Sequence, residues 1–223
     1  MWVGIVKRAA LVVALIAGSV FGAAAATIPV PRPSPLKPPV VIDPERRHTI
    51  VERVSAALSS VETLVGDFEQ IGPDGNRVEG QFYVQKPGKI RFEYDPPSPI
   101  DVIADGRSVV VRNRVLATQD PYPLSQTPLR LLLADHLDLS RDANIVAVLA
   151  NDTLVGIVIE EQQILIGKNR LTLMFGAKDL QLRHWIVTDA QGYDTIVSLY
   201  NLDTKTKPDP DLFKITYEPL NRQ

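Results

Sequence analysis

One stretch of alternating residues, from Arg77 to Pro97, places the strongest constraint on what this chain can fold into. Apolar side chains occupy every second position on both sides of a Lys86-Pro87-Gly88 sequence. Because successive side chains of a strand point to opposite faces, the pattern predicts two amphipathic strands. Proline presets its φ and glycine accepts a positive φ, which favours a tight turn between the strands. The stretch is therefore predicted to be a β-hairpin whose apolar face is formed by Val78, Gly80, Phe82, Val84, Ile90, Phe92 and Tyr94.

The first residues have the pattern of a Sec-type signal peptide. Lys7 and Arg8 form a basic start, residues 9–21 form an apolar stretch, and residues 23–26 are small. The apolar stretch is short for a membrane span, and a proline-rich sequence follows it. No cysteine follows that could accept a lipid, because the chain contains none. Residues 1–26 are therefore predicted to be a cleaved signal peptide on a soluble, exported protein.

Residues 27–44 are rich in proline and are predicted to form an extended arm or linker. A partner-binding PxxP motif in this arm is the alternative. In a chain of 223 residues, the remaining residues 45–223 are enough for one domain with a sizeable core. Without the signal peptide the net charge is about −4, and no basic run occurs. This balance does not favour nucleic acid or an anionic membrane as a partner.

Residues 45–223 are predicted to form a few helices and many short strands. The first helix begins at Asp43 or Pro44 and has apolar residues at helical spacing as far as Val61. A short apolar helix at Leu129–Leu133 is predicted to follow Thr127 as its N-cap. Besides the hairpin, strands are predicted at 63–71, 100–104, 108–112, 115–119, 145–149, 154–159, 171–175, 180–188, 195–201 and 212–217. Ten or eleven short strands with so few helices favour an antiparallel, strongly curved sheet or barrel.

No catalytic or metal-binding motif is found. His48, His136 and His184 are spread over the chain and are predicted to be solvated or locally hydrogen-bonded. The adjacent carboxylates at 160–161 and at 209 and 211 are interpreted as solvated turn charges. The sequence has no nucleophile elbow, no phosphate-binding loop and no H-E-x-x-H. We therefore expect a protein that is not an enzyme and needs no cofactor or metal.

The remaining candidate feature is apolar surface on the strands and on the short helix. The first interpretation is a dry, fully packed core. The second is a ligand cavity, because a curved sheet covered by helices can enclose one. Periodicity alone does not distinguish a filled barrel from a hollow one.

An ordered set of motifs resembles the outer-membrane lipoprotein carrier family, LolA. It begins with the amphipathic first helix and spans about residues 46–219, essentially the whole domain. The motifs, in order, are Phe68-x-Gln70, Gly80-x-Phe82-x-Val84, Lys86-Pro87-Gly88, Ile90-x-Phe92-x-Tyr94-x-x-Pro97, Asp105-Gly106 and Thr127-Pro128-Leu129.

The resemblance implies a mainly β (α+β) fold. In it, a half-open, strongly curved antiparallel β-barrel of about 11 strands carries a helical lid over an apolar cavity. It also implies a monomeric periplasmic carrier that takes acylated lipoproteins from an inner-membrane ABC transporter. The carrier would deliver them to an outer-membrane acceptor, either a receptor or the membrane itself. By this resemblance, the cavity and lid residues are Val54, Leu58, Phe68, Phe82, Val84, Ile90, Phe92, Tyr94, Leu129, Leu132, Leu133, Phe175 and Trp185.

Lys86 departs from the family, which often has arginine immediately before the hairpin proline, where it helps to hold the lid. Lysine lacks the planar fork of arginine, so the resemblance implies a looser or different contact with the lid. The alternative function is a periplasmic sensor domain of the same fold that binds a lipid or a protein. An enzyme is the third and weakest candidate, because no catalytic motif supports it.

Overall fold

The structure is a computed structural model that describes residues 42, 44–163 and 167–216. It contains one antiparallel sheet of eleven strands in the order β6-β5-β4-β3-β2-β1-β11-β10-β9-β8-β7. The predicted mainly β fold is therefore confirmed. In chain order, the elements are α2 (Pro44–Ser59), β1 (Thr63–Ile71), β2 (Arg77–Gln85), β3 (Lys89–Tyr94), β4 (Ile100–Asp105), β5 (Ser108–Asn113), β6 (Thr118–Pro123), η2 (Leu124–Gln126), α3 (Leu129–Leu132), α4 (Leu139–Asp142), β7 (Ile145–Ala150), β8 (Leu154–Gln163), β9 (Gly167–Gly176), β10 (Leu182–Thr188), β11 (Asp194–Asp203) and η3 (Pro210–Phe213).

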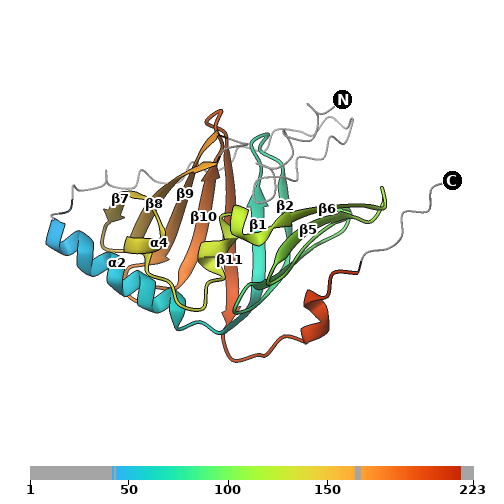
Figure 1. The fold of residues 1–223 in the computed structure, drawn as a ribbon, viewed down its shortest axis with the longest axis horizontal. Coiled ribbons are helices and arrows are strands. Elements are labelled where there is room, and N and C mark those ends of the chain that lie inside the picture. Colours follow the sequence, from blue (N-terminus) through green and yellow to red (C-terminus); the bar gives the residue numbers. More distant parts are fainter. Residues whose placement is uncertain (1–41, 43, 164–166, 217–223) are drawn as a thin grey trace.

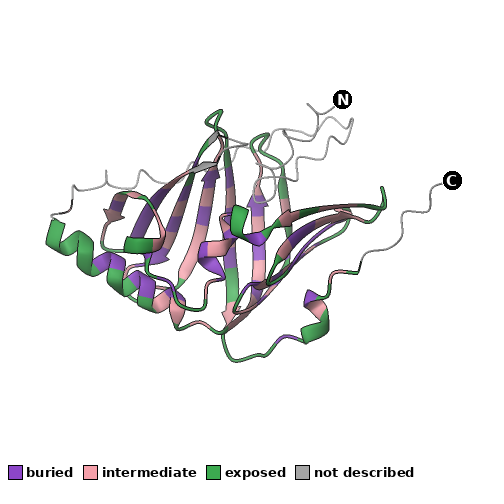
Figure 2. Ribbon diagram, viewed as in Figure 1, coloured by how far each residue is buried: buried purple, intermediate pink, exposed green. Residues whose placement is uncertain are grey.

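The sheet curves strongly but does not close, since its edge strands β6 and β7 do not pair with each other (Figure 1). Helices α2, α3 and α4 pack on the concave face, and their apolar residues join those of the strands in one cluster. Figure 2 shows buried bands along the central strands beneath these helices. The half-open barrel covered by helices is confirmed.

The hairpin predicted at Arg77–Pro97 is present as β2 and β3. Phe82 pairs with Phe92, and Val84 pairs with Ile90. The side chains of all four residues are buried, while the residues between them are more exposed. Gly80 permits the close approach of β3 and of Phe68 on β1. A Cβ at this position would lie 2.0 Å from the Glu93 carbonyl oxygen and 2.9 Å from the Phe68 ring.

A C-terminal segment covers part of the convex face. Its 3₁₀ helix η3 contacts β3 and β4, and Phe213 is buried there. Arg91 donates to the carbonyl of Leu212 at 3.2 Å. Ile103 is buried although it points away from the concave cluster, so β4 is covered on both faces.

The strand predicted at 212–217 is wrong over its described residues. Pro210 at the start of η3 and the Asp209 carboxylate, which accepts from the amide of Asp211 at 2.9 Å, favour a helical turn instead. The apolar Leu212 and Phe213 that suggested a strand belong to that turn. Tyr217 lies outside the described residues.

The strand predicted at 115–119 is also displaced. Asn113 closes a turn by accepting from the amides of Val115 and Leu116, which leaves both apolar side chains exposed. The strand is Thr118–Pro123, so it extends beyond the predicted end and contains Pro121 and Pro123. Proline is tolerated here because β6 is an edge strand.

Helix α3 is shorter than predicted, with four residues, Leu129–Leu132. Thr127 does not cap it, because the Thr127 hydroxyl donates back to the carbonyl of Leu124 at 2.9 Å. Leu180 was predicted in β10 but lies in the preceding turn with a φ of 53°.

The predicted signal peptide and almost all of the proline-rich arm lie outside the described residues, as does Asp43, one of the two residues at which the first helix was predicted to begin. Helix α2 begins at Pro44, and Ile42 packs against the concave core. No helix in the described part of the chain is long and apolar enough to cross a membrane.

Candidate functional site: an apolar cavity beneath the helices

A cavity of about 260 Å³ lies between the helices and the concave face of the sheet. Strands β1, β2, β3, β10 and β11 contribute to its wall, as do the end of α2, the end of α3 and the turn before β10. The lining residues are Ala57, Leu58, Ser60, Val61, Leu64, Phe82, Val84, Lys86, Ile90, Leu132, Leu133, Asp179, Leu180, Gln181, Leu182, Trp185, Leu199, Leu202 and Thr204. Most of these side chains are apolar, which suits a hydrocarbon ligand.

The residues predicted to line a cavity divide into three groups. Leu58, Phe82, Val84, Ile90, Leu132, Leu133 and Trp185 line the main cavity, together with Lys86. Phe92, Tyr94 and Leu129 line a smaller void of about 20 Å³, to which Trp185 also contributes. Val54, Phe68 and Phe175 are buried in the packed cluster around the cavities. Contact of any of these residues with a ligand stays a prediction.

The packed aromatic residues support the cavity floor. Phe68 lies edge-on to Phe92 and Tyr94, with ring centroids 5.0 and 4.9 Å apart. The Tyr94 hydroxyl donates to Gln70 Oε1 at 2.9 Å, and burial raises the pKa of Tyr94. This phenol therefore stays neutral, and its hydrogen bond fixes one end of the small void.

Lys86 is the basic residue of the cavity wall among those described. Its Nζ donates to the carbonyl oxygen of Leu58, near the C-terminal end of α2, at 2.6 Å. A cation at this end of a helix interacts favourably with the carbonyl groups exposed there. Burial lowers the pKa of Lys86 to about 8, while the nearby charge of Asp135 acts in the opposite direction. The predicted role of Lys86 in lid closure stays a prediction, and this bond is the contact through which it would act.

The backbone of the same hairpin turn also reaches both helical segments. The amide of Lys86 donates to the carbonyl of Glu62 just after α2, at 2.8 Å. The amide of Gly88 donates to the carbonyl of Leu133 at the end of α3, at 2.9 Å. Gly88 has a φ of 78°, and a Cβ there would lie 2.6 Å from Gly106 Cα. Glycine is therefore required where this turn passes between α3 and the β4–β5 turn.

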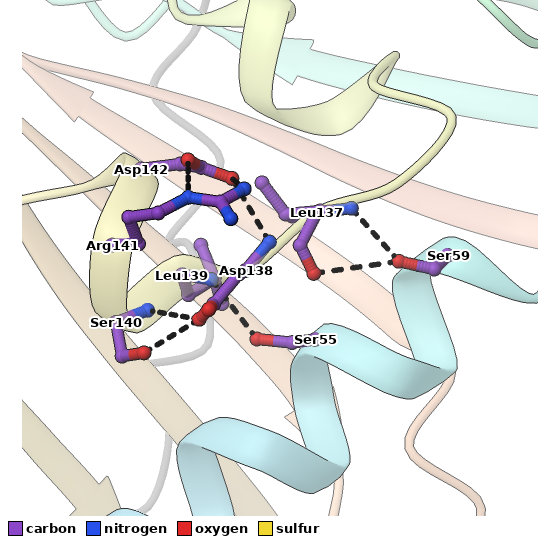
Figure 3. A network of polar contacts seen from close by, with 8 residues as sticks. All are labelled: Ser55, Ser59, Leu137, Asp138, Leu139, Ser140, Arg141 and Asp142. Carbon is purple, nitrogen blue, oxygen red and sulfur yellow. Dashed lines mark hydrogen bonds and ion pairs between the residues drawn. The ribbon is translucent and has the colours of Figure 1, made fainter.

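Two serines of α2 join it to the first residue of α4 and to the segment just before α4 (Figure 3). Ser55 Oγ accepts from the amide of Leu139 at 3.1 Å, and Ser59 Oγ accepts from the amide of Leu137 at 3.0 Å. Ser55 is buried and also donates to the carbonyl of Val51. Helix α2 and residues 129–142 are thus tied together, and we call them the helical lid.

Arg130 fastens α3 to the sheet. Its guanidinium lies 2.5 Å from Glu161 on β8. The adjacent Glu160 pairs across the strands with Lys168 and Arg170, at 2.7 and 2.9 Å. The interpretation of 160–161 as solvated turn charges is therefore wrong, because β8 extends through them and each has a cationic partner. The polar run Glu160-Glu161-Gln162-Gln163 at the end of β8 does not alternate, so the sequence carries no signal that the strand continues through it.

No group of three or more histidine, aspartate or glutamate side chains in the described part of the chain could hold a metal. His48 lies 3.1 Å from Glu52 on the exposed side of α2 and is not among the described residues that line the cavity. Asp179, the acidic residue of the lining, forms an ion pair with Arg183.

Comparison with known proteins identifies the family. Residues 59–216 match the model of the family described as "Outer membrane lipoprotein carrier protein LolA". The chain belongs to this family. The resemblance inferred from the ordered motifs is therefore confirmed.

Two relatives carry the name outer-membrane lipoprotein carrier protein. That of Methylobacillus flagellatus is 30% identical over 47% of this chain, and the match covers 55% of that protein. That of Methylococcus capsulatus is 28% identical over 74% of this chain and 82% of its own length. The chain thus spans little more than half the length of the first relative.

Solved structures of similar proteins share low identity with this chain. A LolA superfamily protein from Nitrosomonas europaea has a TM-score of 0.41 and 11% identity, over 74% of this chain and 97% of that one. MucB in the Pseudomonas aeruginosa MucA/MucB complex has a TM-score of 0.42 and 14% identity, over 75% and 61% of the two chains.

In this LolA family member, part of the cavity wall comes from residues that sequence reasoning did not select. Among them are the five leucines Leu64, Leu180, Leu182, Leu199 and Leu202. Leu199 and Leu64 alternate with polar residues in predicted strands, so their inward direction was readable. Leu180 lines the cavity from a turn in which its backbone is left-handed. No feature of the sequence predicts this backbone conformation.

Proposed function

We propose that this chain is a periplasmic carrier that binds the acyl chains of lipoproteins released from the inner membrane and delivers them to the outer membrane. The observation that carries the proposal is the apolar cavity beneath a helical lid, in a chain of the LolA family. The signal peptide predicted at residues 1–26 is consistent with a periplasmic location.

The size of the cavity bears on how a ligand enters. Its volume of about 260 Å³ is just below the roughly 300–1,000 Å³ of typical small-ligand pockets. An anchor with several acyl chains therefore requires the helical lid to move away from the sheet. The lid residues Leu132 and Leu133 form part of the wall, so movement of the lid enlarges the cavity directly.

The contacts that hold the lid suit a carrier that must open. On the sheet side they include the Lys86–Leu58, Gly88–Leu133 and Arg130–Glu161 contacts. Each burial of a methylene contributes about 0.8 kcal/mol, so acyl chains entering an enlarged cavity offset the loss of a few such contacts. A ligand that binds the open form shifts the population toward it.

Delivery in one direction follows from relative affinity. The carrier needs an inner-membrane ABC transporter to load it, because an acylated anchor leaves a membrane only at a large free-energy cost. It needs an acceptor at the outer membrane, a receptor or the membrane itself, that holds the anchor more tightly than the cavity does. No energy source in the carrier is then required.

The test uses Leu132→Asp, with Leu116→Asp as a matched control. Leu132 is buried in the cavity wall, whereas Leu116 is 68% exposed in the turn before β6. Leu132→Asp places a carboxylate among the acyl chains and should abolish release of lipoproteins from spheroplasts. Leu116→Asp should release them as the unchanged protein does. Circular dichroism checks that both variants keep the sheet.

Unchanged release by a folded Leu132→Asp protein would count against the proposed cavity. Depletion of the protein in cells tests the whole function. Lipoproteins should then accumulate in the inner membrane, and normal delivery to the outer membrane would contradict the carrier role. Recovery of the purified protein with a protein partner but no acyl ligand would favour a sensor domain instead.

A further inference from the structure

Trp185 contributes a buried hydrogen-bond donor that has no acceptor among the described residues. It lies on β10 and is 3% exposed. Its side chain lines both the main cavity and the small void beside it. The indole nitrogen Nε1 is buried and has no hydrogen-bond partner in the described part of the chain. A buried N–H without an acceptor costs about 1–3 kcal/mol, so such a group calls for an explanation.

The neighbours of Trp185 hold the ring in place without supplying an acceptor. Phe92 meets it at a ring-centroid distance of 6.2 Å and an interplanar angle of 69°. Val197 and Leu173 are its partners on the two adjacent strands, and both are buried apolar residues. The indole is therefore fixed among apolar side chains, and the polar groups of the small void, Gln70 and Tyr94, are bonded to each other.

The charged groups of the same cavity wall are already engaged. The Lys86 ammonium donates to the carbonyl of Leu58, and the Asp179 carboxylate accepts from Arg183 and from the amide of Gln181. An indole N–H donates and cannot accept, so it requires an acceptor atom with a lone pair, such as the carbonyl oxygen of a ligand. A plain hydrocarbon chain supplies no such atom.

Resting on the proposed acyl-chain function, we propose that Trp185 is a specificity-determining residue whose indole N–H donates to the carbonyl oxygen of an ester- or amide-linked acyl chain. The cavity then recognises the acyl linkage as well as the chain. It favours acyl esters and amides over hydrocarbon of the same length, because only a carbonyl relieves the unpaired donor.

The first measurement follows the Trp185 indole N–H by nuclear magnetic resonance of the whole chain. The chain has two tryptophans, Trp2 and Trp185, so the Trp185 signal is assigned by its loss in Trp185→Phe. Methyl laurate should move the indole proton signal downfield, as a new hydrogen bond requires. Tetradecane, a hydrocarbon of matched length, should bind without that shift. An indole signal that responds identically to both ligands would overturn the inference.

The second measurement compares affinities by displacement of an apolar fluorescent dye. Trp185→Phe should weaken methyl laurate about five-fold more than tetradecane, since one neutral hydrogen bond is lost. Phe82→Leu, a cavity-wall change that removes no donor, should weaken both ligands by the same factor. An ester-to-hydrocarbon affinity ratio that Trp185→Phe leaves unchanged would overturn the role of the indole.

The two proposals fail in different ways. If methyl laurate and tetradecane both bind the unchanged protein and the ratio does not depend on Trp185, the recognition of the carbonyl is wrong and the carrier proposal stands. If neither ligand binds the unchanged protein, the cavity does not accept acyl chains and both proposals fall.

Discussion

Lys86 is an amino group in the wall of an apolar cavity, and its position explains its lowered pKa. Burial disfavours the ammonium form, while the Leu58 carbonyl and the charge of Asp135 favour it. A lysine donates at a point, whereas the arginine often found before the hairpin proline in this family would present a planar fork. The single hydrogen bond from Lys86 to the Leu58 carbonyl therefore holds α2 less strongly than a bidentate contact from an arginine would.

The pH dependence of stability should report on Lys86. Its pKa falls from the ordinary 10.5 to about 8 on folding, so between these values the unfolded chain binds more protons. The contribution of this group to the free energy of unfolding therefore rises from pH 8 to pH 10.5 and is constant at lower pH. After allowance for partial exposure, the rise should be about 1 kcal/mol.

Urea unfolding of the unchanged protein and of Lys86→Met measures this effect. The difference between their free energies of unfolding should shift in favour of the unchanged protein as pH rises through this window. Because other lysines and tyrosines titrate in both proteins, only the difference is informative. Parallel curves would show that Lys86 is not desolvated in the folded protein.

Gly80 has no side chain, and this allows β3 and the Phe68 ring to pack directly against its backbone. A Cβ there would meet the Glu93 carbonyl oxygen at 2.0 Å and the Phe68 ring at 2.9 Å. Gly80→Ala should lower the free energy of unfolding by about 3 kcal/mol, measured by urea denaturation. Gly75→Ala, at a turn with φ of 78° and open space around it, should cost only about 1 kcal/mol. Equal losses would mean that strand β3 moves aside easily.

At the scale of elements, the helical lid depends on contacts that are distant in sequence. Helix α3 has four residues, too few to be stable alone. It is held by Arg130 on Glu161 and by the Gly88–Leu133 bond. Helix α2 reaches the rest of the lid through Ser55 and Ser59. The lid thus consists of one longer helix, α2, and two short helices, and side-chain hydrogen bonds join them into one unit.

Ser55→Ala should loosen this unit. Without the hydroxyl, the buried amide of Leu139 loses its acceptor, which costs about 1.5 kcal/mol of unfolding free energy. Hydrogen exchange at the Leu139 amide should accelerate as the lid opens locally. Ser60→Ala is the control, because its exposed hydroxyl bonds only within its own turn, and it should cost less than about 0.5 kcal/mol. Unchanged exchange at Leu139 would place the weak point of the lid elsewhere.

At the scale of the whole molecule, the sheet is covered on both faces over part of its width. The helical lid and the cavity occupy the concave face, and the C-terminal segment occupies the convex face over β3 and β4. Arg112 and Gln119 both donate to the carbonyl of Thr216, which holds this segment to β5 and β6. The hairpin that forms one wall of the cavity is therefore supported from behind.

Phe213→Ala tests the importance of that support. Phe213 is 2% exposed, so its loss should lower the free energy of unfolding by about 3 kcal/mol and lower the melting temperature accordingly. Phe213→Leu keeps most of the apolar volume and should cost less than about 1.5 kcal/mol. Equal, small effects of both changes would mean that the C-terminal segment contributes little to the fold.

The sequence by itself determined the sheet, the hairpin and the family. Alternation with a period of two residues is a local property of strands, and the Lys86-Pro87-Gly88 turn fixed the register of β2 against β3. Predictions failed where a polar side chain at the start of an apolar run bonds to the backbone two or three residues later and forms a turn. Val115 and Leu116 lie in a turn because Asn113 accepts from their amides. Leu212 and Phe213 lie in η3, whose first turn is capped by Asp209.

Only the tertiary structure decided which apolar residues line a cavity. Phe68 and Phe82 have the same strand pattern, yet Phe68 is packed among aromatic rings and Phe82 lines the open volume. The left-handed turn at Leu180 and the unpaired indole of Trp185 have no sequence signature. Burial is a local tendency that a sequence records, whereas a void depends on how separate elements fit together in space.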